Sequence, residues 1–352
     1  MKIDDKTSHN SPSIRFPEFT GEWEKCKIED ITDAVSSGKS KNHFSNGEYN
    51  LYGSTGIIGR TDKALYDGKL VLVARVGANA GFLQIINEPC GITDNTLILK
   101  PKGIDAFYLY YFLQHFNLNR LIFGSGQPLI TGGMLKKVKV SLGTISEQSK
   151  IVKFLSLLDE RIATQVRLID RLQSLMIGIA QKIAHSNKPN VRISDCLECS
   201  SSALQESEVN KTGKYPVYGA NGIVGYIDKY HTQNEAIYII KDGSGVGGVS
   251  YVTGKCSSTG TLNILQAKNG HSLKYLYYLL KVFNFVPYKT GMAIPHIYFK
   301  DYGKAKIFCP AYPEQLEYAK LLSSIDGNLR IALDSLKNFN LQKQYLLRHM
   351  LI

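Results

Sequence analysis

The sequence lacks long hydrophobic runs and is short of acidic residues. No stretch of about 18 apolar residues occurs, so no transmembrane helix is expected. The opening stretch, "MKIDDKTSHNSPSIRFPEF", has no apolar signal-peptide core, and we expect a cytoplasmic protein with no membrane partner. Against 42 Lys and Arg stand only 30 Asp and Glu, and the resulting net charge of +12 favours a polyanion or an anionic surface as partner.

Metal-binding patterns are also missing. The six cysteines are too scattered for the disulfide framework of a small secreted protein, and we expect them to be reduced. Cys196 and Cys199 form a lone C-x-x-C without a second pair at zinc spacing, which favours two ordinary thiols. The eight histidines form no HExxH, and His296 is expected in a turn or on the surface. The sequence therefore predicts no metal site.

Known catalytic and nucleotide-binding motifs are absent as well. The "SSGKS" at 36–40 has Asp33 where a Walker loop requires its first glycine. The "GSGVGG" at 243–248 satisfies G-x-G-x-x-G, but strand-like residues follow it instead of a helix. There is no G-x-S-x-G elbow, no PD dipeptide to start a PD-(D/E)xK nuclease motif and no NPPY methyltransferase motif. These absences favour a non-catalytic chain with no cofactor of its own.

The sequence does contain a long internal repeat. "LYGSTGIIGRTDK" at 51–63 returns as "VYGANGIVGYIDK" at 217–229, and "YLYY" at 108–111 returns at 275–278. Shifts of 166 and 167 residues also superpose the pairs Gly77 and Gly243, Gly81 and Gly247, Glu147 and Glu314, Gln148 and Gln315, and Asp159 and Asp326. A period this long excludes solenoids and propellers, whose repeats span about 20 to 50 residues, and indicates a duplicated domain.

Each copy is expected to be an α+β domain followed by a long helix. "KLVLVARV" and "EAIYIIKDG" are typical of strands, whereas "DAFYLYYFLQHF" and "SLKYLYYLLKVF" are typical of amphipathic helices. We expect glycines in tight turns, where positive φ angles are needed. The expected boundaries are a tail at 1–21, a first domain at 22–143, a helix at 144–186, a second domain at 187–311 and a helix at 312–352.

The two helices have the heptad pattern of a coiled coil. Apolar residues recur at steps of four and three over about 38 residues in each, which predicts a seam facing a partner helix. The spacer positions in the first helix are Ile151, Leu155, Leu158, Ile162, Ile169 and Leu172. Those in the second helix are Tyr318, Leu322, Ile325, Leu329, Leu336 and Phe339. The seams also include polar Gln165 and Lys343.

Chain connectivity determines how the helices can pair. The first helix leaves domain one and ends at domain two, while the second leaves domain two, so pairing requires an antiparallel coiled coil with a pseudo-two-fold axis. A protein of this kind suits a long, charged and nearly two-fold partner such as duplex DNA. Two alternatives remain open: a two-headed adaptor that binds carbohydrate or protein, and a DNA-binding regulator that acts alone.

The combined pattern resembles the specificity subunit of Type I restriction-modification systems. The resemblance rests on "RFPEFTGEWEKCKIEDI", the "YGSTGIIG" and "YGANGIVG" loops, the "CPAYPEQ" before the last helix, and the two long helices. It departs from the family at the first helix, where Leu142 and Gly143 replace the Cys309 and Pro310 of the second copy.

The resemblance implies a division of labour between subunits. Each globular domain would be a target recognition domain that reads one half of a split, asymmetric site in double-stranded DNA. The helices would set the gap and dock two methyltransferase subunits, which would bind S-adenosylmethionine and flip out the adenine. ATP is expected on the partner restriction subunits, which translocate and cut DNA.

Differences between the copies indicate candidates for DNA contact. Arg and Asn suit guanine and adenine edges, and lysines suit phosphates. The candidates in the first copy are Arg60, Lys63, Arg75 and Asn79. Those in the second copy are Tyr226, Lys229, Lys241 and Ser244.

Overall fold

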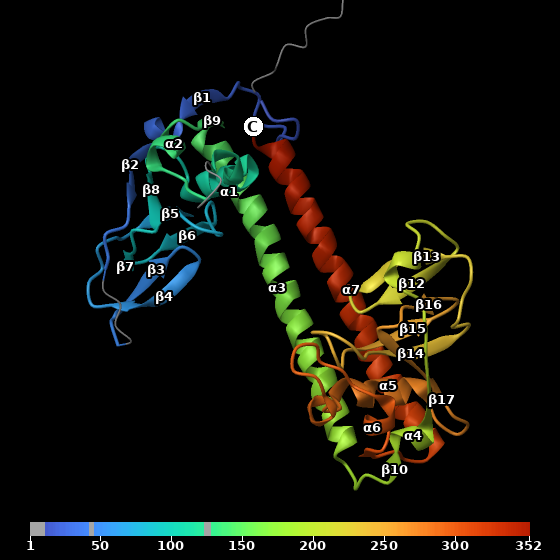
Figure 1. The fold of residues 1–352 in the computed structure, drawn as a ribbon. Coiled ribbons are helices and arrows are strands. Elements are labelled where there is room, and N and C mark those ends of the chain that lie inside the picture. The colour runs from blue at the N-terminus through green and yellow to red at the C-terminus, as the bar shows by residue number, and fades with distance from the viewer. Residues whose placement is uncertain (1–10, 42–45, 123–127) are drawn as a thin grey trace, which may run out of the picture. The chain divides into compact units, whose positions relative to one another are not determined.

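The computed structural model describes residues 11–41, 46–122 and 128–352, which form two compact units (Figure 1). Unit 1 consists of Met1–Gln165 together with Ser335–Ile352, and unit 2 consists of Val166–Asp334. Two long helices, α3 (Ile145–Ala184) and α7 (Tyr312–Met350), each contribute one half to either unit. Unit 1 is therefore built from two separate parts of the chain.

The globular part of unit 1 has three small sheets, ordered β2-β8-β5-β6, β4-β3-β7 and β1-β9. Its strands are β1 (Glu24–Lys27), β2 (Thr32–Ser37), β3 (Tyr49–Gly53), β4 (Gly56–Thr61), β5 (Lys69–Ala74), β6 (Leu83–Asn87), β7 (Cys90–Ile92), β8 (Thr96–Pro101) and β9 (Lys139–Leu142). Its short helices are the 3₁₀ turns η1 (Ile28–Ile31) and η2 (Leu118–Leu121), and α1 (Ala106–Phe116) and α2 (Gly132–Lys136). The helix α1 packs on β5 and β6 and closes the core.

The globular part of unit 2 repeats this plan, with sheets ordered β11-β17-β14-β15, β13-β12-β16 and β10-β18. Its strands are β10 (Val191–Arg192), β11 (Leu197–Ser201), β12 (Tyr215–Gly219), β13 (Gly222–Ile227), β14 (Glu235–Ile240), β15 (Val249–Thr253), β16 (Ser257–Ser258), β17 (Leu262–Ala267) and β18 (Lys306–Ile307). Its short helices are α4 (Ile193–Cys196), η3 (Glu206–Glu208), α5 (Leu273–Val282), η4 (Val286–Tyr288) and α6 (Phe299–Tyr302). The predicted duplication is present in the order of every sheet.

The halves of α3 and α7 pack against each other in antiparallel sense within each unit. In unit 1, early residues of α3 such as Ile151 share a core cluster with late residues of α7 such as Met350. In unit 2, late residues of α3 such as Met176 line a cavity together with Leu329 of α7. Every predicted spacer residue is buried or half-buried. The predicted α+β fold with two long antiparallel helices is confirmed.

A polar group interrupts the apolar seam in unit 1. Lys343 lies 2.6 Å from the carboxylate of Asp159, and its ammonium group is 5.5 Å from the centre of the Tyr111 ring. The hydroxyl of Tyr111 also donates to Asp159 at 2.8 Å. The seam lysine is therefore accommodated because a carboxylate and an aromatic face receive its charge.

Each globular part is joined to its long helix by the same set of hydrogen bonds. In unit 1, buried Gln148 donates to the Gly143 carbonyl at 2.9 Å and accepts from the Asp105 amide at 3.2 Å. The hydroxyl of Tyr108 donates to the Ser141 carbonyl at 3.1 Å. These bonds connect the start of α1, the end of β9 and the first turn of α3.

The second joint uses residues at the equivalent positions. Gln315 donates to the Pro310 carbonyl at 2.8 Å and accepts from the Ser272 amide at 2.9 Å. The hydroxyl of Tyr275 donates to the Phe308 carbonyl at 2.9 Å. The "YLYY" and "EQ" repeats of the sequence are thus explained by the attachment of each helix.

Gln148→Ala is expected to lower the free energy of unfolding by about 1–3 kcal/mol, because it leaves the part-buried Asp105 amide and the part-buried Gly143 carbonyl without their partner. Urea unfolding can be followed by fluorescence of the single tryptophan, Trp23, which lies in unit 1. Lys153→Ala, on the exposed face of the same helix, is the control and should change stability by less than about 0.5 kcal/mol. Equal stability of the two variants would contradict a structural role for this joint.

Residues 11–21, part of the expected tail, pack against both long helices in unit 1. The Ile14 amide donates to the His349 carbonyl at 2.9 Å, near the end of α7. Arg15 makes two hydrogen bonds to Glu147, of 2.6 and 2.8 Å, and the indole of Trp23 donates to the same carboxylate at 3.1 Å. The Glu147 side chain is only 1% exposed, so this charge is buried and fully paired.

This buried carboxylate also explains the unusual turn before α3. A side chain at Gly143 would place a Cβ 2.3 Å from a Glu147 oxygen and 2.8 Å from the Trp23 nitrogen. The second copy has Pro310 at this position, and its Glu314 is exposed. The sequence departure noted at Leu142 and Gly143 therefore accompanies a buried ion pair that is particular to the first joint.

Candidate DNA interface

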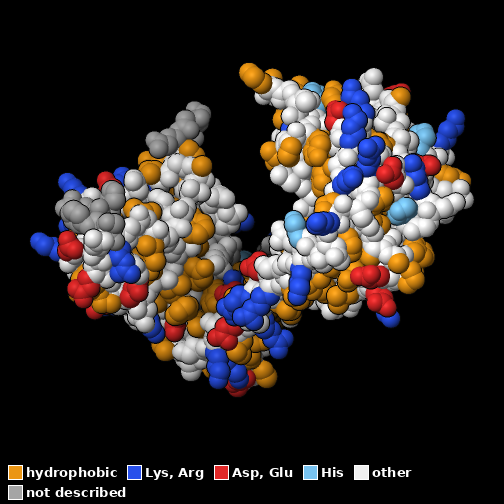
Figure 2. Space-filling view, turned by 90° about the horizontal axis from the view of Figure 1, so that it is seen from below, with side chains coloured by type: hydrophobic (Ala, Val, Ile, Leu, Met, Phe, Trp, Pro, Cys, Tyr) orange, Lys and Arg blue, Asp and Glu red, His pale blue; other side chains and the backbone are white. Residues whose placement is uncertain are grey.

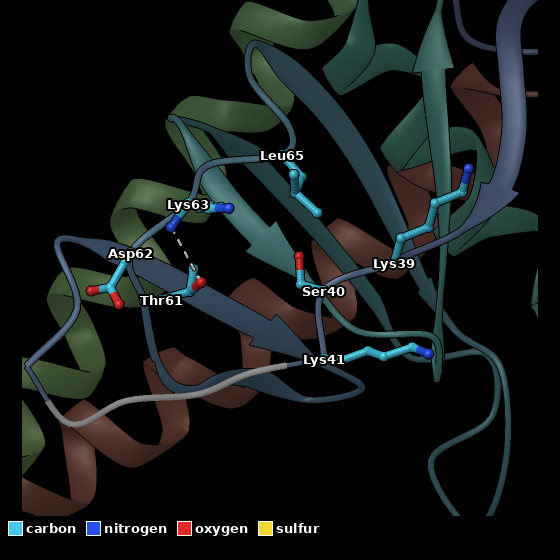
Figure 3. Close-up of a pocket in the computed structure, with 7 residues that line it drawn as sticks. All are labelled: Lys39, Ser40, Lys41, Thr61, Asp62, Lys63 and Leu65. Carbon is cyan, nitrogen blue, oxygen red and sulfur yellow. Dashed lines mark hydrogen bonds between the residues drawn. The ribbon is translucent and has the colours of Figure 1, made fainter.

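A lysine-lined hollow lies beside the first hairpin of unit 1. The cavity, of about 390 Å³, is formed by the segment after β2 and the segment after β4 (Figure 3). It is lined by Lys39, Ser40, Lys41, Thr61, Asp62, Lys63 and Leu65. Within the residues that the structure describes, none of the three lysines forms an ion pair. Three cations around an open hollow suit an anion such as a phosphate group.

Sequence analysis identified only one of these three lysines. Lys63 was predicted as a phosphate contact, whereas Lys39 was considered only within a failed nucleotide loop and Lys41 not at all. The Ser40 backbone bonds to Ile92, with its amide donating to the Ile92 carbonyl at 2.9 Å, and this positions both lysines. The contact joins residues far apart in the sequence, so only the "KSK" spacing could have indicated the site.

The repeated glycine-rich loops are β-hairpins, β3–β4 in unit 1 and β12–β13 in unit 2. Gly56 and Gly222 have φ angles of +133° and +104° at their tips, which confirms the predicted use of glycine in the turn. At Gly53, close packing excludes a side chain, because a Cβ there would lie 2.8 Å from the Ile58 side chain. Ile57 and Ile58 are 56% and 53% exposed, so each hairpin presents apolar side chains to solvent.

The candidate DNA-contact residues on and next to the hairpins differ in whether their side chains are free to bind a ligand. Arg60 is exposed, but its guanidinium donates to the Glu48 carbonyl at 2.9 Å. Tyr226 on the second hairpin is 36% exposed, and Lys63 and Lys229, which follow the hairpins, are exposed. Tyr226 and the lysines are therefore accessible to a ligand, while Arg60 is partly engaged by its own backbone.

A polar cluster supports the first hairpin. The carboxylate of Glu88 accepts hydrogen bonds from Asn50 at 2.8 Å and from the Tyr52 hydroxyl at 2.6 Å. These bonds lower the pKa of Glu88, while burial and the bond to Glu88 raise the pKa of Tyr52 to about 12. The carboxylate stays charged at neutral pH and fixes the strand that leads into the hairpin tip.

Two further loops occupy equivalent positions in the units. Residues 75–82 follow β5, and residues 241–248 follow β14, with positive φ at Gly77 and Gly243. The Gly77 amide donates to the Pro128 carbonyl at 3.0 Å, and the Gly243 amide donates to the Pro295 carbonyl at 2.9 Å. Because the same bonds anchor both loops, residues that differ between them occupy comparable positions.

The predicted candidates on these loops lie at or near the surface. Asn79 and Ser244 are exposed. Arg75 is half-buried, and its buried Nε atom has no hydrogen-bond partner among the described residues. Lys241 is half-buried, and its Nζ atom lies 3.9 Å from a carboxylate oxygen of Asp242. Of these four residues, Arg75 thus has a buried side-chain donor that is unsatisfied within the described part of the chain.

The segment 286–298 of unit 2 exposes apolar side chains and was not singled out by sequence analysis. Met292 is fully exposed and Ile294 is 59% exposed. His296 accepts or donates a 2.8 Å hydrogen bond with Asp242, which ties the segment to the 241–248 loop. His296 was predicted in a turn or on the surface, but it is half-buried and forms isolated β-bridges with Asp242 and Thr290. The equivalent positions 123–127 of unit 1 lie outside the described residues.

Lysine and tyrosine side chains alternate on unit 2. Lys255 lies 4.7 Å from the centre of the Tyr230 ring, and Lys214 lies 5.5 Å from that of Tyr215. The two tyrosine rings pack edge to face at 5.1 Å. Figure 2 shows Lys and Arg side chains gathered beside hydrophobic ones on the unit that carries no grey atoms. Basic groups interleaved with aromatic rings are typical of nucleic-acid-binding surfaces.

Comparison with known proteins assigns the chain to a family. The family of the Type I restriction modification DNA specificity domain matches twice, over residues 20–174 and 186–338. The chain belongs to this family. The two matches fall on the two copies of the repeat, and the resemblance noted from the sequence is confirmed.

Two curated specificity subunits are similar to parts of this family member. A putative type I restriction enzyme specificity subunit of Haemophilus influenzae is 25% identical over 123 residues, 34% of this chain and 32% of that protein. The specificity subunit of the type I restriction enzyme EcoprrI of Escherichia coli is 26% identical over 127 residues, 36% of this chain and 31% of that protein. The alignments thus span about a third of the length of these relatives.

Solved structures from Type I restriction-modification systems share the fold. The S subunit of the Type-I restriction-modification system of M. genitalium matches with a TM-score of 0.72 and 19% identity, over 97% of this chain and 99% of that one. A chain from a structure concerned with complex assembly and conformational transition of the type I R-M system matches with a TM-score of 0.55 and 12% identity, over 94% and 97%. Among the described residues of this specificity-domain protein, no helix is long and apolar enough to cross a membrane.

Proposed function

We propose that the chain is the DNA-recognition subunit of a cytoplasmic Type I restriction-modification complex and has no catalytic site of its own. It binds a split, asymmetric target in double-stranded DNA, with one recognition domain for each half. The observation that carries this proposal is the double family match on two copies that share one scaffold and differ at exposed polar positions. To read two different half-sites, loops of the same structure must carry different residues.

The partner subunits follow from the same proposal. Two modification subunits, which bind S-adenosylmethionine, dock on the long helices, and ATP-dependent restriction subunits join them. In support, both helices expose apolar side chains outside the seam, a composition typical of protein interfaces. These side chains are Leu157, Leu168, Leu175 and Ile177 on α3 and Leu316, Leu321, Ile331 and Leu341 on α7.

DNA contacts are divided between two kinds of surface. The Lys39, Lys41 and Lys63 hollow and the exposed Lys229 bind phosphates, which position the duplex. The loops at 75–82 and 241–248 read bases, with Arg75 and Lys241 at equivalent positions. An arginine and a lysine there favour guanine, and their different shapes allow different half-sites.

A genome-wide map of N6-methyladenine tests this function. The map is compared between cells that carry the gene and cells that lack it, with the neighbouring methyltransferase gene intact in both. The expected result is a split, asymmetric motif that disappears on deletion and returns with a plasmid copy. A methylation pattern that is the same in both strains, with the protein and the methyltransferase both present, would contradict the proposal.

Arg75→Ala is expected to relax one half of that motif and leave the other half unchanged. Loss of one bidentate base contact removes about 1–3 kcal/mol of discrimination, or roughly 5- to 150-fold between bases at that position. A map of N6-methyladenine in cells that carry the variant measures this change. Lys241→Ala is the corresponding variant of unit 2 and is expected to relax the other half of the motif. If both variants relax the same half-site, the assignment of one half to each domain is wrong.

A further inference from the structure

Three side chains with metal-binding atoms meet inside unit 2. Cys196 is the last residue of α4, His271 lies in the turn before α5, and Cys309 follows β18. Their two sulfur atoms and one imidazole nitrogen all lie within 4.8 Å of one another. Sulfur ligands held about 2.3 Å from one zinc ion lie roughly 3.8 Å apart at tetrahedral angles. Small side-chain rotations therefore suffice to bring all three atoms to bonding distance.

The burial of these atoms also favours a ligand. Cys196 is completely buried and Cys309 is 7% exposed. The Nδ1 atom of His271 is buried and has no hydrogen-bond partner among the described residues. A buried ring nitrogen without a partner is costly, and coordination of a metal ion would satisfy it.

The first copy of the repeat provides an internal comparison. The Ile28 and Ile193 amides donate to the Val138 and Ala305 carbonyls, both at 3.0 Å, so the segments that lead to Ile31 and Cys196 are equivalent.

The other two positions of the cluster are likewise defined by equivalent contacts. The turns before α1 and α5 carry Ile104 and His271, each followed by the residue whose amide bonds to the joint glutamine. The hydroxyls of Tyr108 and Tyr275 bond to the residues just before Leu142 and Cys309. Unit 1 thus fills the same place with Ile31, Ile104 and Leu142, which belong to or pack against its apolar core. All three positions therefore carry apolar residues in the first copy and potential metal ligands in the second.

Hydrogen bonds to backbone groups, from other backbone groups and from the Asn190 side chain, hold the three ligand segments in place. Asn190 accepts from the Cys309 amide at 2.8 Å and donates to the Cys309 carbonyl at 2.7 Å. The Lys268 amide donates to the Cys196 carbonyl at 2.9 Å, and the His271 amide donates to the Lys268 carbonyl at 3.2 Å. Such fixed supports are typical of metal sites, because they keep the ligands in position before the ion binds.

We propose that Cys196, Cys309 and the Nδ1 atom of His271 bind one Zn²⁺ ion, with solvent as the fourth ligand. Two thiolates and an imidazole are ligands that zinc prefers, and two thiolate charges balance the ion. Zn²⁺ takes the place of the thiol protons, which are released to solvent, and no redox change is involved. The site is independent of DNA recognition and differs from the sequence-based expectation of no metal, which weighed Cys196 against Cys199 and not against Cys309.

The position of the site indicates its purpose. It connects the beginning of the second globular part with the turn before α5 and with the residue before Pro310, where the chain turns into α7. The ion therefore cross-links the joint that Gln315 and Tyr275 also secure. In the first joint, the buried Arg15–Glu147 pair is the corresponding reinforcement. Each long helix would thus have one additional contact that holds it to its globular part, an ion pair in unit 1 and a zinc ion in unit 2.

The test measures zinc in the purified full-length chain, kept under a reducing agent. We expect one equivalent of Zn²⁺ per chain and none in the variant C196I/H271I/C309L, which carries the residues of the first copy and so retains a packed core. After removal of zinc, Co²⁺ should give a thiolate-to-cobalt charge-transfer band in the original protein only. The single variant Cys309→Leu should lose more than the roughly 10–100-fold in zinc affinity that is typical of losing an outer-shell partner.

Cys199→Ser is the control, because Cys199 is half-buried on β11 and outside the cluster. It should keep the full zinc content and the cobalt band. Equal zinc content in the original protein and the triple variant would overturn the proposal.

Discussion

The affinity of the chain for duplex DNA is expected to fall by about 10³- to 10⁵-fold as the salt concentration rises from about 50 to about 200 mM. This range corresponds to roughly 6–10 neutralised phosphates, each of which releases counterions when a lysine or arginine binds it. The net charge of +12 and the lysines around the unit 1 hollow supply the required cations. The measurement is a titration of the chain, in complex with its modification subunits, with DNA that carries the methylated motif.

A triple variant and a control variant separate phosphate binding by the three lysines from the effect of the net charge of the chain. K39A/K41A/K63A should reduce the slope of log affinity against log salt by about 3, roughly one for each lost phosphate contact. Lys102→Ala is the control. Lys102 follows Pro101, which pairs with Thr32 at the start of β2, whereas the hollow lies after the other end of this strand. Affinity that does not depend on salt would contradict phosphate binding and would favour the adaptor that binds carbohydrate or protein.

Arg15→Leu is expected to lower the free energy of unfolding by about 3–5 kcal/mol, because it leaves the buried charge of Glu147 without its ion-pair partner. The Trp23 indole would still donate to that carboxylate but cannot balance its charge. Urea unfolding followed by Trp23 fluorescence reports this change, since all three residues belong to unit 1. The double variant R15L/E147L removes both charges and should recover part of the loss.

Two controls distinguish this network from ordinary surface pairs. Glu314→Gln changes the equivalent carboxylate of the second copy, which is exposed and contacts only the Tyr318 hydroxyl in the described part of the chain, and should cost less than about 0.5 kcal/mol. Lys150→Ala removes an exposed pair with Glu18 and should cost less than about 1 kcal/mol. If Arg15→Leu is no more harmful than these variants, the carboxylate is not effectively buried in solution.

The periodic features of this fold could be predicted from the sequence. The heptads that start at Ile151 and at Tyr318 predicted helices of about 38 residues, and the structure has 40 and 39. The glycine turns of the repeated loops and the "YLYY" helices also formed where their patterns indicated. Such elements are predictable because their signal is local, repeated at a fixed step and present twice.

The contacts between distant segments could not be predicted in the same way. Lys39 and Lys63 meet because β3, β4 and β7 form one small sheet, and no local pattern gives that pairing. Cys196 was compared with Cys199, its neighbour in the chain, whereas the structure places it beside Cys309. The DNA-contact residues proposed on the loops remain predictions, because side-chain identity at an exposed turn does not reveal what it binds.

The division of unit 1 between two parts of the chain has a consequence for synthesis. Ile151, Leu155 and Leu158 complete their packing only against Leu346, Leu347 and Met350, which are synthesised long after them. At roughly 5–20 residues per second, these partners arrive seconds to tens of seconds after Gln165. Unit 2, from Val166 to Asp334, is contiguous and can assemble earlier. The apolar face of the first half of α3 therefore lacks these partners until the second half of α7 has been synthesised, although unit 2 can already be complete.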